Sequence, residues 1–358
     1  MRTFNNLLVT GGAGFIGSNF IRFLFEKTDF AGRVINMDAL TYAGNPASLD
    51  DVAAKFGDRY VFRRADIRDR AAITEIFNTF SIDAVCHFAA ESHVDRSIAA
   101  PDDFVQTNIM GTFNLLEAAR ARAAAVAGFG LFHHVSTDEV FGSLGETGYF
   151  CESTAYDPHS PYSASKAASD HLVRAYKDTY KLPITISNCS NNYGAFQFPE
   201  KLIPLTIMNA LEGKPLPVYG AGANIRDWLH VDDHCSAIWT IMNRAALGET
   251  YVVGGRCELR NIDVVKRICA EVDRVAPPLA SGEPRESLIT FVKDRPGHDM
   301  RYAIDCSRLE TELGWRQSED AATGFAKTVR WYLENPAWVE SVRTGEYRRW
   351  IDANYAQR

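Results

Sequence analysis

Tyr162 and Lys166 are the residues whose types and spacing best suit catalysis. Ser160 and Pro161 precede them, and these residue types favour the start of a helix. On such a helix, positions i and i+4 lie one above the other on the same face. The ammonium group of Lys166 then stabilises a phenolate, so we expect it to lower the pKa of Tyr162 and make this residue a base that removes a hydroxyl proton. Alone, the same spacing is also common on solvated helix faces.

A pair of carboxylates in Thr137-Asp138-Glu139 is the second candidate for chemistry. These residues follow the strand-like run 131–136. Ligands of open α/β sheets bind beyond the carboxyl ends of the strands, so we expect the three side chains beside Tyr162, where Thr137 can hydrogen-bond the hydroxyl that Tyr162 deprotonates. Two carboxyl groups can serve as acid and base when one is neutral and the other charged. The spacing alone would favour an exposed acidic turn, and the expected place beside Tyr162 reverses that preference.

A glycine-rich turn near the N-terminus predicts that the chain binds a dinucleotide. Gly11, Gly14 and Gly17 follow the strand-like run 7–10 and open a helical stretch. Glycines at this spacing make a tight turn and let the backbone approach a pyrophosphate. The start of the helix, with Phe15 and Ile16, then offers unpaired amide groups and a partial positive charge to the phosphates.

Asp38 predicts which dinucleotide is bound. It ends the second expected strand, about 20 residues after the glycine turn, where it can accept hydrogen bonds from a ribose hydroxyl. Its charge would repel a 2′-phosphate, so NAD is expected rather than NADP. Asp66 and Ile67 end the third strand, where an adenine ring would lie. The segment 89–92 ends the fourth strand, under the ribose and nicotinamide.

Composition excludes several classes of protein. The chain has 358 residues and a net charge of −7, without the basic cluster of a nucleic-acid binder. We expect no membrane partner, because no apolar run approaches the roughly 18 residues of a membrane span, and no signal peptide is apparent. Seven scattered cysteines and nine histidines lack metal spacing, so we expect no metal and a cytoplasmic protein with reduced thiols.

Short apolar runs alternate with helical stretches through the first half of the chain, which predicts an α/β fold with a Rossmann-type, doubly wound parallel sheet. We expect a NAD-binding domain at 1–190, with a returning segment at 228–256, and a smaller, less regular lobe at 191–358. The expected strands are 7–10, 34–37, 60–64, 84–89, 131–136 and 184–188, with later ones at 228–231 and 250–253. The expected helices are 16–26, 71–79, 104–123, 162–180 and 232–244.

These features together resemble the extended short-chain dehydrogenase/reductases. Within that family, Thr137-Asp138-Glu139 is similar to the nucleotide-sugar 4,6-dehydratases, because the epimerases typically lack the acid pair. Ala39 is a departure, since a lysine is commoner there; it is expected near the adenosine and leaves the catalytic residues unaffected. The resemblance runs from about residue 5 to about residue 330 and is also carried by segments 38–45, 90–97, 191–194, 201–204 and 295–299.

The resemblance implies a reaction without net oxidation. Tyr162 would take the proton of a sugar 4-hydroxyl, Glu139 would remove the hydrogen on carbon 5, and Asp138 would protonate the departing 6-hydroxyl. The implied substrate is dTDP-linked glucose and the product a 4-keto-6-deoxy sugar, a precursor of deoxysugars such as rhamnose. A homodimer is also implied, with the helices at 104–123 and 162–180 forming its interface.

The resemblance also implies that the lobe at 191–358 mainly binds the nucleotide sugar. Position and resemblance together assign binding residues. Arg226 and Arg295 are candidates for the phosphates, because a guanidinium matches phosphate oxygens. The expected NAD contacts are Gly11, Gly14, Phe15, Ile16, Gly17, Asp38, Ala39, Leu40, Thr41, Asp66, Ile67, Ala89, Ala90, Ser92, Thr107, Tyr162, Lys166 and Asn192. The expected substrate contacts are Ser92, His93, Thr137, Asp138, Glu139, Asn191, Lys201, Leu202, Pro217, Tyr219, Arg226, Asn261, Arg295 and His298.

Three other interpretations stay open. A non-catalytic NAD-binding sensor on the same fold would be expected to lack Tyr162 or Lys166. An epimerase or decarboxylase of UDP-sugars fits the acid pair poorly. A dehydratase of a UDP- or GDP-linked sugar would differ from the main interpretation in only a few loop residues around the base.

Overall fold

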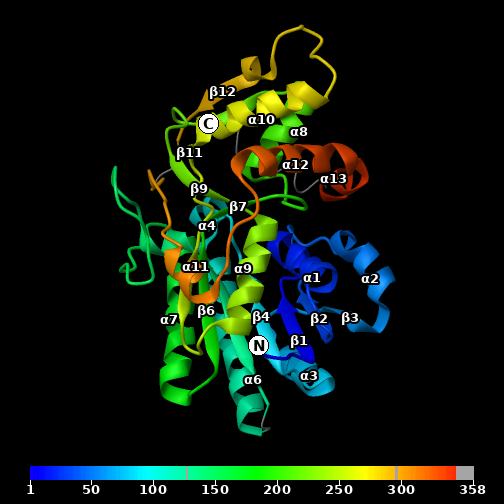
Figure 1. Cartoon of the computed structure of the whole chain (residues 1–358), viewed down its shortest axis with the longest axis vertical. Coiled ribbons are helices and arrows are strands. Elements are labelled where there is room, and N and C mark those ends of the chain that lie inside the picture. The colour runs from blue at the N-terminus through cyan, green and yellow to red at the C-terminus, as the bar shows by residue number, and fades with distance from the viewer. Residues whose placement is uncertain (126–127, 295–296, 344–358) are drawn as a thin grey trace.

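The computed structural model of the chain describes residues 1–125, 128–294 and 297–343. Seven parallel strands form its central sheet, in the order β3-β2-β1-β4-β5-β6-β10 (Figure 1). This confirms the doubly wound, Rossmann-type fold. The strands are β1 (Asn6–Thr10), β2 (Arg33–Asp38), β3 (Tyr60–Arg64), β4 (Ala84–His87), β5 (Leu131–Thr137), β6 (Ile184–Cys189) and β10 (Thr250–Val253).

Helices cover both faces of this sheet, so its strands are apolar on both sides. Leu7 and Val9 of β1 enter the core under α1 and α9, whereas Leu8 enters the core under α3, α6 and α7. Among the described residues, no helix is long and apolar enough to cross a membrane. The helices of these two layers are α1 (Phe15–Lys27), α2 (Asp50–Phe56), α3 (Arg70–Phe80), α6 (Thr112–Ala125), α7 (Pro161–Tyr180) and α9 (Val231–Arg244).

The helix expected at 104–123 forms, but residues 105–111 of it are a π-helix. The chain forms α4 (Val94–Ala99), α5 (Pro101–Phe104) and a π-helix (Val105–Gly111) before α6 begins. Asn108, inside the π-helix, hydrogen-bonds both the backbone N–H and the carbonyl of Glu91, at 2.9 and 3.0 Å. The wider turn therefore aims this side chain at the segment after β4, a tertiary contact that helical periodicity does not reveal.

A second lobe stands above the carboxyl ends of the sheet (Figure 1). Its core is built mainly by α8, α10 and α12, which pack on two small sheets. Its strands are β7 (Asn191–Tyr193), β8 (Leu216–Tyr219), β9 (Ile225–His230), β11 (Glu258–Arg260) and β12 (Ile289–Val292). Its helices are α8 (Leu202–Glu212), α10 (Asn261–Val275), α12 (Ala321–Glu334) and α13 (Pro336–Val342), and α11 (Ser307–Leu313) packs beside α9 and β10.

One strand expected to return to the first sheet does not. The strand β9, expected at 228–231, pairs with β7 and β11 in a separate three-stranded sheet. Its side chains Arg226 and Asp227 are polar, which suits this small sheet better than the apolar interior of the central sheet. The following helix α9 does return to cover the central sheet, and β10 joins that sheet beside β6. The domain boundaries themselves stay a prediction.

The last described helix, α13, packs on a loop that follows β2. The indole nitrogen of Trp338 donates a hydrogen bond to the hydroxyl of Ser48 at 3.0 Å. The side-chain amide of Asn45 donates to the hydroxyl of Ser341 at 2.8 Å. The part of this loop nearest β2 lines the main cavity, so the C-terminal helix helps to hold one wall of that cavity.

Candidate active site

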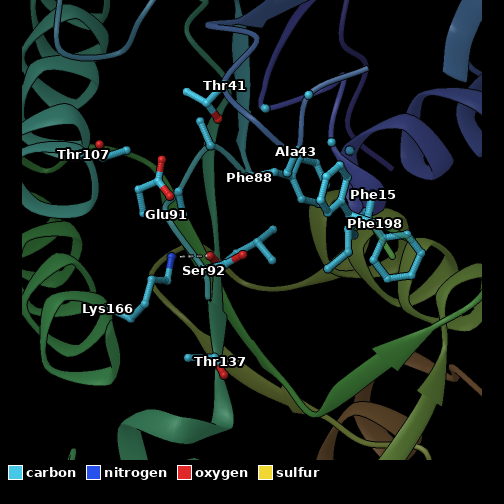
Figure 2. Close-up of a pocket in the computed structure, with 18 of the residues that line it drawn as sticks. Phe15, Thr41, Ala43, Phe88, Glu91, Ser92, Thr107, Thr137, Lys166 and Phe198 are labelled. Atoms are coloured by element: carbon cyan, nitrogen blue, oxygen red, sulfur yellow. Dashed lines mark hydrogen bonds between the residues drawn. The ribbon is translucent and has the colours of Figure 1, made fainter. Parts of the chain in front are cut away.

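A cavity of about 550 Å³ lies at the carboxyl ends of β1 to β6. Lys166 and Thr137 lie across it from Phe15 and Phe198 (Figure 2). It lies where the strand order reverses between β1 and β4, the place where open α/β sheets bind ligands. Of the expected site residues, it is lined by Gly11, Gly14, Phe15, Ile16, Gly17, Asp38, Ala39, Thr41, Asp66, Ile67, Ala89, Ala90, Ser92, Thr107, Thr137, Asp138, Glu139, Tyr162, Lys166, Asn191, Asn192 and Lys201.

The turn between β1 and α1 is shaped for close approach of a phosphate. Gly11 has a positive φ of 69°, which favours glycine. A Cβ atom on Gly17 would lie 2.3 Å from the carbonyl oxygen of Gly11, so α1 packs on the turn only without a side chain there. No side chain caps the start of α1, and its first turn holds no acidic residue. The N–H groups that the helix leaves unpaired are therefore available to an anion.

Asp38 ends β2 at the side of this turn. Its carboxylate oxygens accept hydrogen bonds from the backbone N–H groups of Ala13, at 2.9 Å, and Leu40, at 2.8 Å. Burial raises the pKa of Asp38, and the two backbone hydrogen bonds oppose that rise. Leu40, at a positive φ of 55°, contributes this backbone contact and is not among the residues lining the cavity.

The start of α7 holds Tyr162 and Lys166 as expected. Ser160 and Ser163 form a capping box, and proline is the first helical residue. The ammonium nitrogen of Lys166 donates to the carbonyl oxygen of Val135, the third-last residue of β5, at 2.9 Å. Both side chains are nearly fully buried and line the same cavity.

The pKa of Tyr162 differs from the prediction. Burial, followed by the carboxylate of Glu139, raises this pKa well above its ordinary value, and a hydrogen bond with Thr137 opposes the rise. Burial also lowers the pKa of Lys166. The expectation of a lowered pKa for Tyr162 is wrong for this structure, because burial and the nearby carboxylates outweigh the hydrogen bond with Thr137. Burial of this kind is not visible in the local sequence.

Asp138 and Glu139 lie in a 3₁₀ turn (Asp138–Phe141) that follows β5. The hydroxyl of Thr137 donates to Oδ1 of Asp138 at 3.4 Å and accepts from the N–H of Glu139 at 3.2 Å. Asp138 is 1 % exposed. Burial, then the carboxylates of Glu139 and Asp227, raise its pKa well above the ordinary value. The structure therefore favours a neutral Asp138 that can donate a proton.

Arg226, expected to bind phosphate, is anchored to the protein. Its guanidinium donates to the backbone carbonyl of Asp299 at 2.9 Å and lies 4.1 Å from the ring centre of Tyr302. The side chain is buried and lowers the pKa of Asp138, which places its charge near the acid pair. It is not among the residues lining the cavity, so its role at a phosphate stays a prediction.

The remaining expected substrate residues lie outside the cavity lining. The hydroxyl of Tyr219 donates to Asp95 at 3.0 Å, and its ring centre is 6.2 Å from that of His298. His93 is buried, with Nε2 4.0 Å from a carboxylate oxygen of Glu200. Arg295 falls outside the described residues. The others are Pro217 on β8, Leu202 at the start of α8 and Asn261 at the start of α10.

Several lining residues were not among the expected contacts. Most of these residues directly flank an expected contact, so extending each run of expected contacts by one or two positions along the chain finds them. Asp103, Gln197 and Phe198 carry no such signal, because they reach the cavity through tertiary packing. Burial, followed by Asp138, raises the pKa of Cys189 to about 12. These residues are Met37, Tyr42, Ala43, Gly44, Ala65, Arg68, Phe88, Glu91, Asp103, Val135, Ser136, Cys189, Ser190, Gln197, Phe198 and Glu200.

Comparison with known proteins identifies the family. A family model described as GDP-mannose 4,6 dehydratase matches residues 8–328. A probable dTDP-glucose 4,6-dehydratase of Sinorhizobium fredii is 59 % identical over 345 residues, which cover 95 % of this chain and 96 % of the relative. The chain belongs to the dTDP-glucose 4,6-dehydratase family.

Solved structures of dTDP-glucose 4,6-dehydratases share the fold. The enzyme of Streptomyces venezuelae, with NAD and TYD bound, has a TM-score of 0.86 and 46 % sequence identity over 94 % of this chain and 100 % of that one. The enzyme of Bacillus anthracis, in complex with NAD, has a TM-score of 0.83 and 40 % identity over 95 % and 100 % of the two chains.

The substitution Asp138→Asn is expected to stabilise the fold at neutral pH. The pKa of Asp138 is higher in the folded protein than in the unfolded chain, where it has its ordinary value. The wild-type protein therefore loses free energy of unfolding as pH rises from the ordinary pKa toward the raised one. The loss is about 1.4 kcal/mol for each pKa unit that separates the two states. Asparagine does not ionise, so the variant's advantage in free energy of unfolding should grow as pH rises from the ordinary aspartate pKa of about 3.9 to neutral pH.

Urea unfolding of both proteins across this range measures the advantage. Asp58→Asn, at an exposed site, is the matched control and should differ from wild type by an amount that does not depend on pH. An advantage of Asp138→Asn that is equally constant with pH would contradict the neutral state of Asp138.

Proposed function

We propose that the chain is an NAD-dependent dehydratase that converts dTDP-glucose to dTDP-4-keto-6-deoxyglucose. The observation that carries the proposal is the convergence of Tyr162, Lys166, Asp138 and Glu139 in one cavity with the glycine turn of β1 and α1. A simple dehydrogenase needs only Tyr162 and Lys166, whereas an elimination of water also needs an acid and a base such as Asp138 and Glu139. The names of relatives that match nearly the whole chain support the choice of sugar nucleotide.

The residues of the cavity fit NAD. The start of α1 offers N–H groups to a pyrophosphate, and the carboxylate of Asp38 disfavours a 2′-phosphate. Among the described residues, the buried side-chain oxygens of Ser136, Ser190 and Asn191 have no hydrogen-bond partner in the protein and line the cavity, as expected of atoms that a ligand satisfies. Bound here, NAD supplies a hydride acceptor that later returns the hydride to the sugar.

Tyr162 serves as the base of the oxidation step by taking the proton of the 4-hydroxyl. Because burial opposes a phenolate, the step needs a positive charge and a hydrogen-bond donor close by. Lys166 supplies the charge one helical turn away, and the Thr137 hydroxyl supplies the hydrogen bond.

Glu139 and Asp138 divide the elimination between them. The new 4-ketone acidifies the hydrogen on carbon 5, which Glu139 takes as a proton. Asp138, held neutral by burial, donates a proton to the departing 6-hydroxyl, which leaves as water. Glu139 then returns its proton to carbon 5. The two acids thus hold different roles because one is fully buried and the other is only partly buried.

We also propose that the protein is a cytoplasmic homodimer whose product serves the synthesis of deoxysugars such as rhamnose. The helices α6 and α7 lie side by side on one face of the sheet (Figure 1). The exposed apolar side chains Ile98, Val105 and Met110 lie in the helical segments that lead into α6. A two-fold contact between copies would cover such a surface.

The substrate is tested by incubating the purified protein with dTDP-glucose, UDP-glucose and GDP-mannose and measuring the alkali-sensitive chromophore of a keto sugar. We expect dTDP-glucose to turn over best, with NAD copurifying and absorbance at the NADH wavelength near baseline. NADH that accumulates in step with product would make the protein a simple dehydrogenase. A preference for a UDP- or GDP-sugar would replace the assigned base.

Tyr162→Phe and Glu139→Gln are expected to block different steps, each slowing turnover by ~10²–10⁴ because a positioned base is lost. A single turnover on dTDP-glucose, followed by NADH absorbance and by exchange of solvent deuterium into carbon 5, separates them. Glu139→Gln should trap NADH with little exchange, and Tyr162→Phe should show neither signal. Glu146→Gln, in an exposed loop, is the control. Wild-type turnover and exchange by Glu139→Gln would refute the assigned mechanism.

The oligomeric state is tested by light scattering at micromolar concentration, where we expect twice the chain mass of 39.9 kDa. Met110→Glu places a charge in the proposed interface and should shift the protein toward monomer. Tyr149→Glu, at an exposed aromatic in the loop before α7, should leave the mass unchanged. A wild-type protein with the mass of one chain would reject the dimer.

A further inference from the structure

Asp170 lies one helical turn after Lys166 on α7, and none of the steps above uses it. Its side chain is 0 % exposed, and Lys166 is 5 % exposed. Residues four positions apart on a helix share a face, so the side chains of Lys166 and Asp170 lie on the same buried face of α7. Buried charges of this kind are costly unless they are paired and hydrogen-bonded.

The carboxylate of Asp170 is held from three elements. Its Oδ2 accepts hydrogen bonds from the hydroxyl of Tyr156, at 2.7 Å, and from the side-chain amide of Asn188, at 3.0 Å. Nε2 of His134 lies 3.1 Å from Oδ1. These partners come from the loop before α7, from β6 and from β5. The position of the carboxylate is therefore fixed by the sheet and not by α7 alone.

The groups around Asp170 leave it charged and leave His134 neutral. Burial raises the pKa of Asp170, but the contacts with His134, Lys166 and Tyr156 outweigh it, and the pKa stays below the ordinary value. Burial, followed by the charge of Lys166, lowers the pKa of His134 to about 4. The other titratable groups that face this cluster are Cys189 on β6, His87 on β4 and Arg174 on α7.

Lys166 depends on this carboxylate. Burial lowers the pKa of its ammonium group, and Asp170 is the strongest influence that opposes the decrease, ahead of Cys189. The hydrogen bond of Lys166 to the carbonyl of Val135 satisfies one donor but supplies no full negative charge. The net charge of the buried lysine–aspartate pair is zero, which is the arrangement that a water-poor interior tolerates.

We propose that Asp170 is a positioning residue for catalysis, whose carboxylate is the fixed counter-charge that keeps Lys166 an ammonium group beside Tyr162. The inference rests on the proposed function, because the charge of Lys166 matters only if Tyr162 is the base. Asn188 adds a second link: the same amide nitrogen donates to Asp170 and, at 3.2 Å, to the backbone carbonyl of Thr137. Asp170 thus acts on the charge of one active-site residue and on the placement of another.

The substitution Asp170→Asn tests the proposal, because it removes the charge with little change of shape. The ammonium of Lys166 then loses its counter-charge and releases its proton more readily. We expect the alkaline limb of the pH profile of kcat to move about 1 to 3 pH units lower. KM for dTDP-glucose and the amount of copurified NAD should stay at wild-type values. Asp178→Asn, an exposed aspartate on the same helix, is the matched control and should leave the profile unchanged.

Asp170→Glu keeps the charge on a longer side chain, and it should lower kcat while leaving the alkaline limb at the wild-type pH. A folded, NAD-containing Asp170→Asn with an unshifted limb overturns the proposal, because a structural role would reduce the melting temperature alone. If Asp170→Asn does not fold, the pH profile of Asp170→Glu tests the proposal. An alkaline limb of kcat at the wild-type pH supports the role of Asp170 as counter-charge, and an alkaline limb at lower pH overturns that role. A wild-type protein inactive on every nucleotide sugar would reject the proposed function, a separate outcome.

Discussion

The burial of ionisable side chains at the carboxyl ends of β5 and β6 is the constraint on which the site depends. Asp138, Tyr162 and Lys166 are all nearly fully buried. Burial raises the pKa of Asp138 and of Tyr162 and lowers that of Lys166, so it favours the neutral form of each side chain. In such surroundings a charge can form only beside a group that already stabilises it. The lysine, the threonine hydroxyl and the two acids are therefore packed in one corner of the cavity, at the ends of adjacent elements.

The scaffold meets this constraint by fixing α7 firmly at its first turn. The capping box of Ser160 and Ser163 satisfies the first N–H groups of the helix. From the other side, the amide of Asn108 donates to the hydroxyl of Ser165 at 2.8 Å and also bonds the backbone of Glu91. The π-helix is what aims Asn108 there, so an irregular turn in one helix orients the catalytic face of another.

Local rules account for what could be predicted from the sequence. The glycine turn, the start of α7 and the alternation that builds the sheet each depend on a few adjacent residues, and all three appear as expected. The errors arise where distant contacts decide. The pairing of β9 and the raised pKa of Tyr162 both depend on what the fold packs against them. So does the π-helix, which periodicity does not distinguish from an α-helix.

The substrate lobe shows the same limit more strongly. Its proposed contacts, such as Arg226 on β9 and Tyr219 on β8, are polar residues in short strands, where neither periodicity nor capping rules indicate what a side chain contacts. In the structure both are engaged with protein groups, Arg226 with Asp299 and Tyr219 with Asp95. A pattern of residue types can thus indicate that a lobe binds a charged ligand without indicating which atoms face it.

The hydroxyl of Thr137 bears on how the site is restored after each turnover. In the proposed reaction Tyr162 ends with one proton more and Asp138 with one fewer, whereas Glu139 recovers its starting state. One proton must therefore pass from the phenol to the carboxylate before the next sugar reacts. The Thr137 hydroxyl is hydrogen-bonded to both groups, and a hydroxyl can accept one proton while giving up another. In the proposed reaction, this hydroxyl is placed to pass a proton from the base to the acid, which would reset both together.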